Sequence, residues 1–184
     1  WANRLRTALE QNRIVPWFQP IMNLHTNRID KFECLVRMLD DDGSPISPTH
    51  FLPVARKIRL YRQITRRMVD QCVDRFTDTD LQFSLNLSCD DLLDSELSSY
   101  ILQRLQNPAL ARRVIFEILE SEGIENYQAV RQFIDKAKAL GCRIAIDDFG
   151  TGYSNFEHLL RLDVDLIKID GSLIRQLDSD ADAR

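Results

Sequence analysis

Two adjacent acids, Asp147 and Asp148, end an apolar stretch and are followed at once by the sequence Phe-Gly-Thr-Gly. Neighbouring carboxylates repel each other, so the buried end of a strand is not expected to hold them unless a positive charge lies close by. Divalent cations would neutralise both acids. Gly150 and Gly152 would supply the turn that lets both side chains reach such metals. Asp148 could also merely cap the turn that follows it.

Other apolar stretches carry a polar side chain near the C-terminal half of the strand that they predict. With Asp147, these side chains are Glu33, Asn86, Glu117 and Lys168. Carboxylate and amide oxygens suit a hard cation such as Mg²⁺ or Mn²⁺ rather than zinc, which prefers Cys or His. Two metals that share one carboxylate form the usual clamp for phosphodiester hydrolysis.

Two basic residues could take part in the same chemistry. Lys168 could hold the attacking water or a phosphate oxygen, and Arg37, on the same strand face as Glu33, could grip a phosphate with two hydrogen bonds. Each residue also has a structural interpretation, because a polar group inside a strand is usually satisfied by a neighbour. Lys168 could simply pair with Glu117, and Arg37 could be a solvated edge residue. The joint occurrence of five metal-compatible strand ends favours the functional interpretation.

Alternating apolar and amphipathic runs predict the elements that position these residues. We expect strands over 15–24, 28–39, 81–88, 113–120, 143–149 and 165–170. We expect helices over 2–12, from 48 onward past Ala55, and over 61–75, 90–106, 126–140 and about 154–162. From the second strand onward, strands and helices alternate, which is typical of a mainly parallel sheet with helices outside it.

A doubly wound sheet and a (β/α) barrel both fit this alternation. An open sheet with helices on both faces would bury the polar strand faces at a cost of several kcal/mol for each unpaired charge. A barrel lets the same faces converge at its C-terminal mouth, where the active sites of such barrels lie. We therefore predict an α/β fold of the TIM-barrel type, formed as one domain over residues 1–184 with a leading helix at 1–12.

The composition argues against several kinds of function. The net charge of −4 and the pI of about 5.4 give no basic field that would attract a nucleic acid polymer or an anionic lipid surface. No apolar run is long enough to span a bilayer. The four cysteines are scattered, with no Cys-x-x-Cys pair, which favours a reducing, cytoplasmic location.

The segment DDFGTGYSNFEHLLRLDVDLIKID resembles the most distinctive segment of the EAL family of cyclic di-GMP phosphodiesterases. FQPI, ECL followed by Arg37, NLS and FEILES are similar to the other motifs of that family, in the same order. The resemblance covers nearly the whole chain from about Trp17. It implies a TIM-type barrel with an irregular first strand that hydrolyses cyclic di-GMP to linear pGpG with Mg²⁺ or Mn²⁺.

The resemblance also implies a role for each matching residue. Glu33, Asp147 and Lys168 would be catalytic, with Asp147 bridging two metals and Lys168 ordering the hydrolytic water. Glu120 would anchor the DDFGTGYS loop, of which Gly150 and Gly152 are the hinge; this loop is similar to a dimer-linked control element, which implies a homodimer. The metal ligands would be Glu33, Asn86, Glu117, Asp147 and Asp148, and the nucleotide contacts Gln19, Leu35 and Arg37.

Some positions depart from the family pattern. Cys34 replaces the usual Ala, Leu119 a usual Thr, and Arg56 a usual Glu. The family continues through two more strands, so we expect a barrel that lacks its last two strands and binds a second metal weakly. Two alternatives to an active enzyme are a cyclic di-GMP receptor and a protein-interaction module. The full-length protein is expected to carry a further sensor or regulatory domain, which could anchor it to a membrane.

Overall fold

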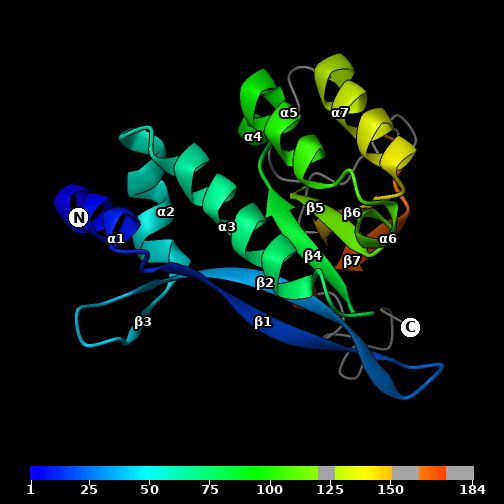
Figure 1. The fold of residues 1–184 in the computed structure, drawn as a ribbon, viewed down its shortest axis with the longest axis horizontal. Coiled ribbons are helices and arrows are strands. Elements are labelled where there is room, and N and C mark those ends of the chain that lie inside the picture. The colour runs from blue at the N-terminus through cyan, green and yellow to red at the C-terminus, as the bar shows by residue number, and fades with distance from the viewer. Residues whose placement is uncertain (120–126, 151–161, 173–184) are drawn as a thin grey trace.

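The structure of the chain is a computed structural model, and it describes residues 1–119, 127–150 and 162–172. One sheet of seven strands forms its centre, with the order β1-β2-β4-β5-β6-β7 and β3 paired to β2 (Figure 1). The strands are β1 (Ile14–Asn23), β2 (Arg28–Leu39), β3 (Pro45–Ile46), β4 (Gln82–Leu87), β5 (Val114–Leu119), β6 (Arg143–Phe149) and β7 (Leu166–Ile169).

Seven helices are described around the sheet. They are α1 (Ala2–Glu10), α2 (Pro48–Lys57), α3 (Tyr61–Phe76), α4 (Cys89–Leu93), α5 (Ser95–Arg104), α6 (Pro108–Ala111) and α7 (Tyr127–Leu140). The structure confirms the predicted β-helix-β order. It adds β3 and α6, which the sequence did not predict, and it divides the predicted helix 90–106 at Asp94, whose side chain caps α5. The helix predicted at about 154–162 lies almost wholly outside the described residues.

The helices α3, α4, α5 and α7 lie on one side of the sheet (Figure 1). α3 packs on β1, β2 and β4, while α7 packs on β6. The opposite face of the sheet carries the polar side chains of the strands. A doubly wound sheet would have helices on both faces, whereas α3, α4, α5 and α7 of the described residues all cover one face, as in the wall of a barrel, which agrees with the fold class predicted from the polar faces.

The first strand gives the sheet its irregularity. β1 runs antiparallel to β2, whereas β2, β4, β5, β6 and β7 are parallel to one another. Among the described strands, β1 and β7 stand at the two ends of the sheet, so the described sheet is open rather than closed. The open sheet agrees with the prediction of an incomplete barrel.

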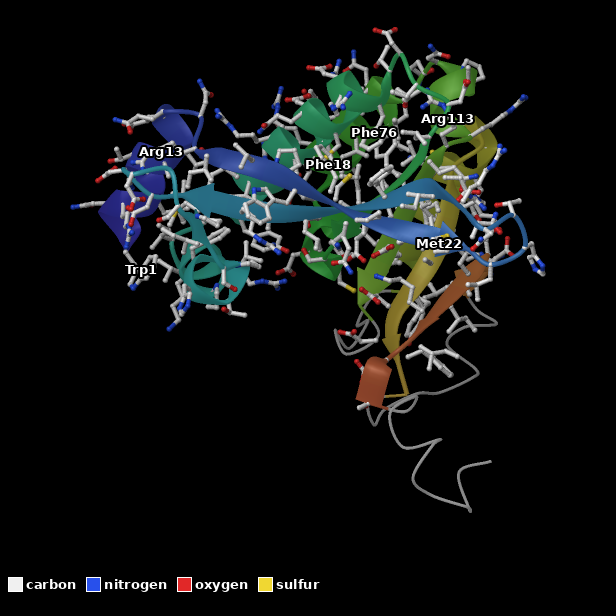
Figure 2. All side chains as sticks on the ribbon, turned by 90° about the horizontal axis from the view of Figure 1, so that it is seen from below. Trp1, Arg13, Phe18, Met22, Phe76 and Arg113 are labelled. Carbon is white, nitrogen blue, oxygen red and sulfur yellow. The ribbon has the colours of Figure 1, made fainter. Side chains whose placement is uncertain are left out.

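The hydrophobic core lies between the sheet and the helix layer. Phe76 of α3 stacks on Phe83 of β4, with ring centroids 4.5 Å apart, and meets the edge of Phe18 of β1 at 5.4 Å (Figure 2). Arg113 ties the far end of this layer together, because its guanidinium donates to the carbonyl oxygens of Phe76 and Leu81. The core thus holds β1, β4 and α3 in fixed relative positions.

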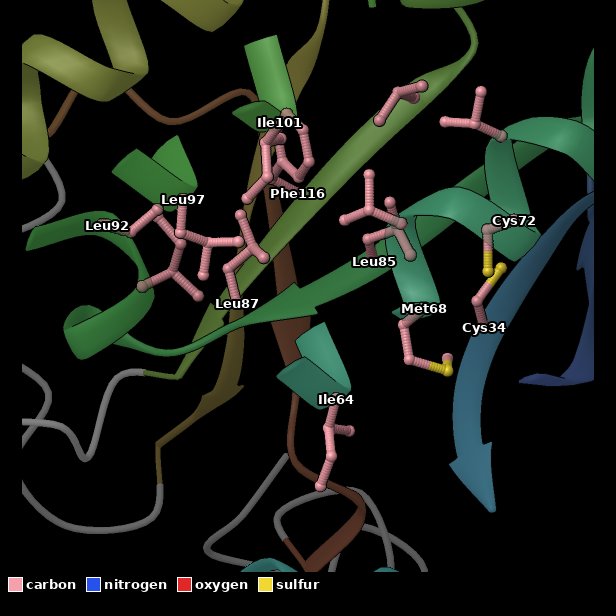
Figure 3. Packing of buried hydrophobic residues seen from close by; sticks show 14 of the residues in the cluster. Cys34, Ile64, Met68, Cys72, Leu85, Leu87, Leu92, Leu97, Ile101 and Phe116 are labelled. Carbon is pink, nitrogen blue, oxygen red and sulfur yellow. The ribbon is translucent and has the colours of Figure 1, made fainter. Parts of the chain in front are cut away.

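Cys34 of β2 and Cys72 of α3 face each other in the same layer (Figure 3). Both are buried, and the hydrogen bond between them, together with burial, raises the pKa of the Cys34 thiol well above its usual range. Cys34 therefore points away from the polar face, as the alternation along β2 predicts. None of the described helices is long and apolar enough to cross a membrane.

Candidate active site

Three carboxylates meet around one ammonium group on the polar face of the sheet. Lys168 Nζ lies 2.6 Å from Glu117 Oε2 and 3.0 Å from both Glu33 Oε2 and Asp147 Oδ2. Asn86 Nδ2 donates to Glu33 Oε1 at 3.3 Å. The structure therefore brings together Glu33, Asn86, Glu117, Asp147 and Lys168, from five different strands, as the sequence predicted.

Strand register explains why these five side chains converge. Asn86 of β4 lies opposite Glu117 of β5, and Glu117 lies opposite Ala145 of β6. Because side chains alternate between the two faces of a strand, Asp147 shares the face of Ala145, two residues earlier. Ala145 in turn lies opposite Leu166 of β7, two residues before Lys168. Parallel pairing therefore aligns the polar residues across the sheet.

Burial controls the electrostatics of the cluster. The side chain of Glu117 is only 3% exposed, and this burial raises the pKa of its carboxyl above the ordinary value, with Glu33 adding to the effect and Lys168 opposing it. Burial also disfavours the charge of Lys168, but the hydrogen bonds and charges of Glu117, Asp147 and Glu33 outweigh it and raise the Lys168 pKa. Lys168 is thus the internal counter-ion of three acids.

The same three carboxylates could hold a divalent cation. Single carboxylate oxygens of Glu33, Glu117 and Asp147 all lie within 4.8 Å of one another. Mg²⁺ binds oxygen at about 2.1 Å, so two ligands on opposite sides of the ion stand about 4.2 Å apart. Only one pair of three ligands can be opposite each other, and neighbouring ligands of an octahedral ion stand about 3.0 Å apart. Binding of Mg²⁺ would therefore require the three acids to move closer together, by up to about 1.8 Å for a neighbouring pair. The donor set contains only oxygen, which suits Mg²⁺ or Mn²⁺.

Asp148 lies at an irregular point of β6. Its φ angle is +57°, in the left-handed region, and the pairing of β6 with β7 shifts register between Ile146 and Phe149. Its backbone N–H donates to Asp147 Oδ1 at 2.9 Å. Burial, followed by the charge of Asp147, raises the pKa of the Asp148 carboxyl. The turn that separates the two acids therefore begins at Asp148 itself, before Gly150, which has a φ of +100°.

The predicted nucleotide contacts lie beside the acids on β1 and β2. Gln19 is exposed and stands directly opposite Glu33 in the β1–β2 register, which places both side chains on one face. Arg37 donates from Nη1 to the carbonyl oxygen of Val36 and lies over the ring of Trp17, 5.6 Å from its centroid.

A cavity of about 210 Å³ is lined by Leu35, by Arg37 and by Asn86, whose amide donates to Glu33. It opens because β2 and β4 stop pairing at Cys34 and Leu85, while β2 continues with β1 as far as Met38. Its lining comes from β2, β4, α2 and α3 and includes Leu35, Arg37, Leu52, Tyr61, Ile64, Met68 and Asn86. The residues of α2 and α3 could not be predicted as part of the site from the sequence, because only the tertiary packing of these helices places them here.

Two predicted loop anchors, Glu120 and Gly152, lie outside the described residues. One further group was missed but has a sequence signal. Ser88 and Asp91 have the spacing of a capping box, Ser-x-x-acid, and form one at the start of α4. The box begins at Ser88, two residues after Asn86, so it lies at the edge of the candidate site.

The comparisons with known proteins agree with this geometry. The family model of the EAL domain matches residues 2–184. The chain is 34% identical to the cyclic di-GMP phosphodiesterase PdeF of Escherichia coli over 97% of this chain and 24% of that protein. It is 28% identical to the cyclic di-GMP phosphodiesterase PdeB of Shewanella oneidensis, over 96% of this chain and 22% of that protein. The chain spans about a quarter of the length of these curated relatives.

Solved structures show the same fold. The chain superposes with a TM-score of 0.85 and 30% identity on the PaMucR phosphodiesterase in complex with c-di-GMP, covering 98% of this chain and 76% of that one. It superposes with a TM-score of 0.86 and 27% identity on the FimX EAL domain of Pseudomonas aeruginosa bound to c-di-GMP, covering 96% and 74%. With an acidic cluster on the polar face of a barrel wall and a family match over nearly its whole length, this chain belongs to the EAL domain family.

Proposed function

We propose that this domain hydrolyses cyclic di-GMP to linear pGpG in bacterial second-messenger signalling. The convergence of Glu33, Glu117 and Asp147 on one cation position, next to a cavity that ends at Arg37, is the observation that carries the proposal. The names of the relatives support the choice of substrate. An active enzyme needs an intact acid set, and the described part of the set is intact.

Each residue has a role in this proposal. Glu33, Asn86, Glu117, Asp147 and Asp148 would hold Mg²⁺ or Mn²⁺, which when bound supplies a nucleophilic water at neutral pH and neutralises charge on the phosphate. Asp147 is proposed to serve two metals, and the second metal is proposed to bind weakly in this chain. Lys168, held among the acids, would keep the water in line with phosphorus, while the 3′-oxygen leaves on the opposite side.

The cavity and its rim are proposed to bind one end of the dinucleotide. Leu35 offers apolar contact, and Arg37 and Gln19 offer hydrogen bonds to phosphate or base. The lining is mostly apolar with few polar groups, as is usual for the sites of flat heterocycles. Glu120, Gly150 and Gly152 are proposed to anchor and hinge the loop that follows the acids.

We propose that the protein acts in the cytoplasm as a homodimer in which this loop transmits a signal. A further sensor or regulatory domain is proposed because the curated relatives are about four times as long as this chain. These proposals concern the full-length protein, and the chemistry proposed for the site does not depend on them.

Incubation of the full-length protein with Mn²⁺ and cyclic di-GMP tests the function. We expect chromatography to show pGpG as the product, and the Glu33→Gln variant to form at least about 100-fold less, as for loss of a group that stabilises charge in the transition state. A folded, metal-loaded protein that binds the dinucleotide but never forms pGpG would contradict hydrolysis and favour a receptor. Absence of both binding and turnover would favour an interaction module.

A further inference from the structure

Three buried side chains form a hydrogen-bonded cluster next to the candidate metal site. Asp91 of α4 accepts at Oδ1 from Thr65 Oγ1, at 3.0 Å. It accepts at Oδ2 from the backbone N–H of Ser88, at 3.0 Å, and from Ser88 Oγ, at 2.8 Å. The exposed fractions are 3% for Asp91, 2% for Ser88 and 7% for Thr65. We call Thr65, Ser88 and Asp91 the β4 clamp.

The capping of α4 explains only half of this cluster. Oδ2 of Asp91 completes the capping box with Ser88, which is a local interaction within one turn. Oδ1 instead reaches Thr65, 26 residues earlier in the chain and on α3. A carboxylate that is almost fully buried is costly unless several donors compensate it. The Thr65 bond thus ties the end of β4 to a different layer of the fold.

The clamp lies where β4 has lost a neighbour. The pairing of β2 with β4 stops at Cys34 and Leu85, so at Asn86 the backbone of β4 pairs only with β5. On the other side of Asn86 lies the cavity of about 210 Å³, and Thr65 is one of the residues that line it. Figure 3 shows α3, with Ile64 and Met68, beside Leu85 of β4. The clamp therefore restrains the strand on the side where β2 no longer does.

We propose that the β4 clamp positions Asn86 for metal binding, so that Thr65 and Asp91 are positioning residues of the site. The proposal rests on the role of Asn86 as a metal ligand in the proposed function. Ser88 follows Asn86 by two residues. Hydrogen bonds that hold Ser88 in place therefore restrain the backbone at Asn86 and, with it, the orientation of the Asn86 side chain. Loosening the clamp changes the distance from the amide oxygen to the three carboxylates and leaves the core intact.

Isosteric substitution of Thr65 separates positioning from stability. Thr65→Val keeps the volume and removes the donor to Asp91, while Thr65→Ser keeps the donor. Thr77→Val is the matched control, because Thr77 Oγ1 donates to the carbonyl oxygen of Val73 at the other end of α3, at 2.7 Å. Calorimetric titration of the full-length protein with Mn²⁺, below the melting temperature of each variant, gives the metal Kd, and thermal unfolding without metal gives Tm.

We expect Thr65→Val to weaken Mn²⁺ binding by about 3- to 10-fold. Loss of a group that hydrogen-bonds directly to a metal ligand weakens metal binding by about 10- to 100-fold, and Thr65 acts less directly, through Asp91 and Ser88. Thr65→Ser should restore Kd to within about twofold of the wild type, since it restores the same hydrogen bond. Thr77→Val should leave Kd unchanged, and it should lower Tm less than Thr65→Val because Thr77 is exposed.

Asn86→Ala serves as the reference for the metal role itself. If Asn86→Ala weakens Mn²⁺ binding but Thr65→Val has the wild-type Kd, the clamp is only a helix cap and the inference is overturned while the proposed function stands. If Asn86→Ala itself leaves Kd unchanged, the ligand assignment of the proposed function fails, and the clamp loses its role with it.

Discussion

Lys168 shows that a structural and a functional role can coincide in one residue. The sequence left open whether Lys168 pairs with Glu117 or serves the reaction. The structure shows the pair with Glu117 at 2.6 Å and also contacts of 3.0 Å to both Glu33 and Asp147. An ammonium group among three carboxylates stabilises the site without metal, and the same group stands where it can order a water. The two interpretations are therefore compatible.

Replacement of Lys168 by Met tests its role as counter-ion. Without the ammonium group, three carboxylates repel one another, so we expect a lower metal-free Tm near neutral pH. Mn²⁺ should then raise Tm more in Lys168→Met than in the wild type, because the ion relieves a repulsion that Lys168 otherwise relieves. Lys57→Met, at an exposed position of α2, is the control and should behave as the wild type. An equal or smaller metal-induced shift in Lys168→Met would contradict the counter-ion role.

Asp147 and Arg37 should affect different kinetic constants. Asp147 lies within the acid cluster, so Asp147→Asn is expected to lower kcat by about 100- to 1000-fold, as for loss of a group that stabilises charge in the transition state. Arg37 lies at the cavity rim and contributes to binding, so Arg37→Ala should act mainly by raising KM. Steady-state kinetics with cyclic di-GMP measures both constants. A defect confined to KM in both variants would show that the metal assignment of Asp147 is wrong.

The elements were predictable where their patterns are strong. The strands at 28–39 and 143–149 have the predicted bounds, because each is a compact apolar run that ends at turn-forming polar or glycine residues. β3 is two residues long and exists only by pairing with β2, so no local pattern marks it. The mostly helical stretch predicted at 90–106 is confirmed, but it is broken at Asp94, which adopts an extended conformation and starts a new helix. The cavity could not be predicted, since it arises where β2 and β4 stop pairing.

The cap of α5 predicts a pH-dependent stability. Asp94 Oδ1 accepts from the backbone N–H groups of Glu96 and Leu97, and Arg62 lies 3.1 Å from Oδ2. The hydrogen bond from Leu97 and the charge of Arg62 lower the Asp94 pKa below the ordinary value of 3.8. A carboxyl whose pKa is lower in the folded state stabilises above its unfolded pKa and loses this contribution as pH falls through its folded pKa.

We therefore expect Asp94→Ala to lower the free energy of unfolding by about 1–2 kcal/mol at neutral pH, as for loss of a helix cap. The difference from the wild type should shrink as the pH falls below 3.8. Urea unfolding at a series of pH values measures it. Asp78→Ala, at an exposed turn residue, is the control and should cost little at any pH. A difference that stays constant into strong acid would show that the charge of Asp94 contributes nothing to the cap.

At the scale of the whole molecule, the polar strand faces are sufficient to predict the fold class. Five strands with polar residues on one face require a place where these faces meet, and a barrel mouth provides it. The helices on the other face bury the apolar side chains, including Phe83 and Phe116. The polar pattern does not predict whether the barrel closes, because closure depends on how many strands are present.

The open sheet predicts how a polypeptide of these 184 residues behaves by itself. Strands β1 and β7 end the described sheet, and unpaired strand edges favour pairing with another chain. Ile167 and Ile169 of β7 are 45% and 56% exposed, on the strand face opposite to Lys168. Exposed apolar groups next to a free edge favour association between copies. We expect size-exclusion chromatography with light scattering to show oligomers, and metal titration to show at most one tightly bound Mn²⁺ ion.

Two double variants identify the surface responsible. Ile167→Lys with Ile169→Lys should shift the polypeptide toward monomer, because charge on an edge strand opposes pairing. Leu24→Lys with Ile29→Lys is the matched control at the β1–β2 hairpin, where both residues are also exposed; it adds the same charge away from the β7 edge and should reduce association less. Equal effects of the two double variants would show that general charge, rather than the β7 edge, controls association. A monodisperse wild-type monomer that binds two Mn²⁺ ions and turns over cyclic di-GMP would show that these 184 residues form a complete site, and that the expected shortage of strands is wrong.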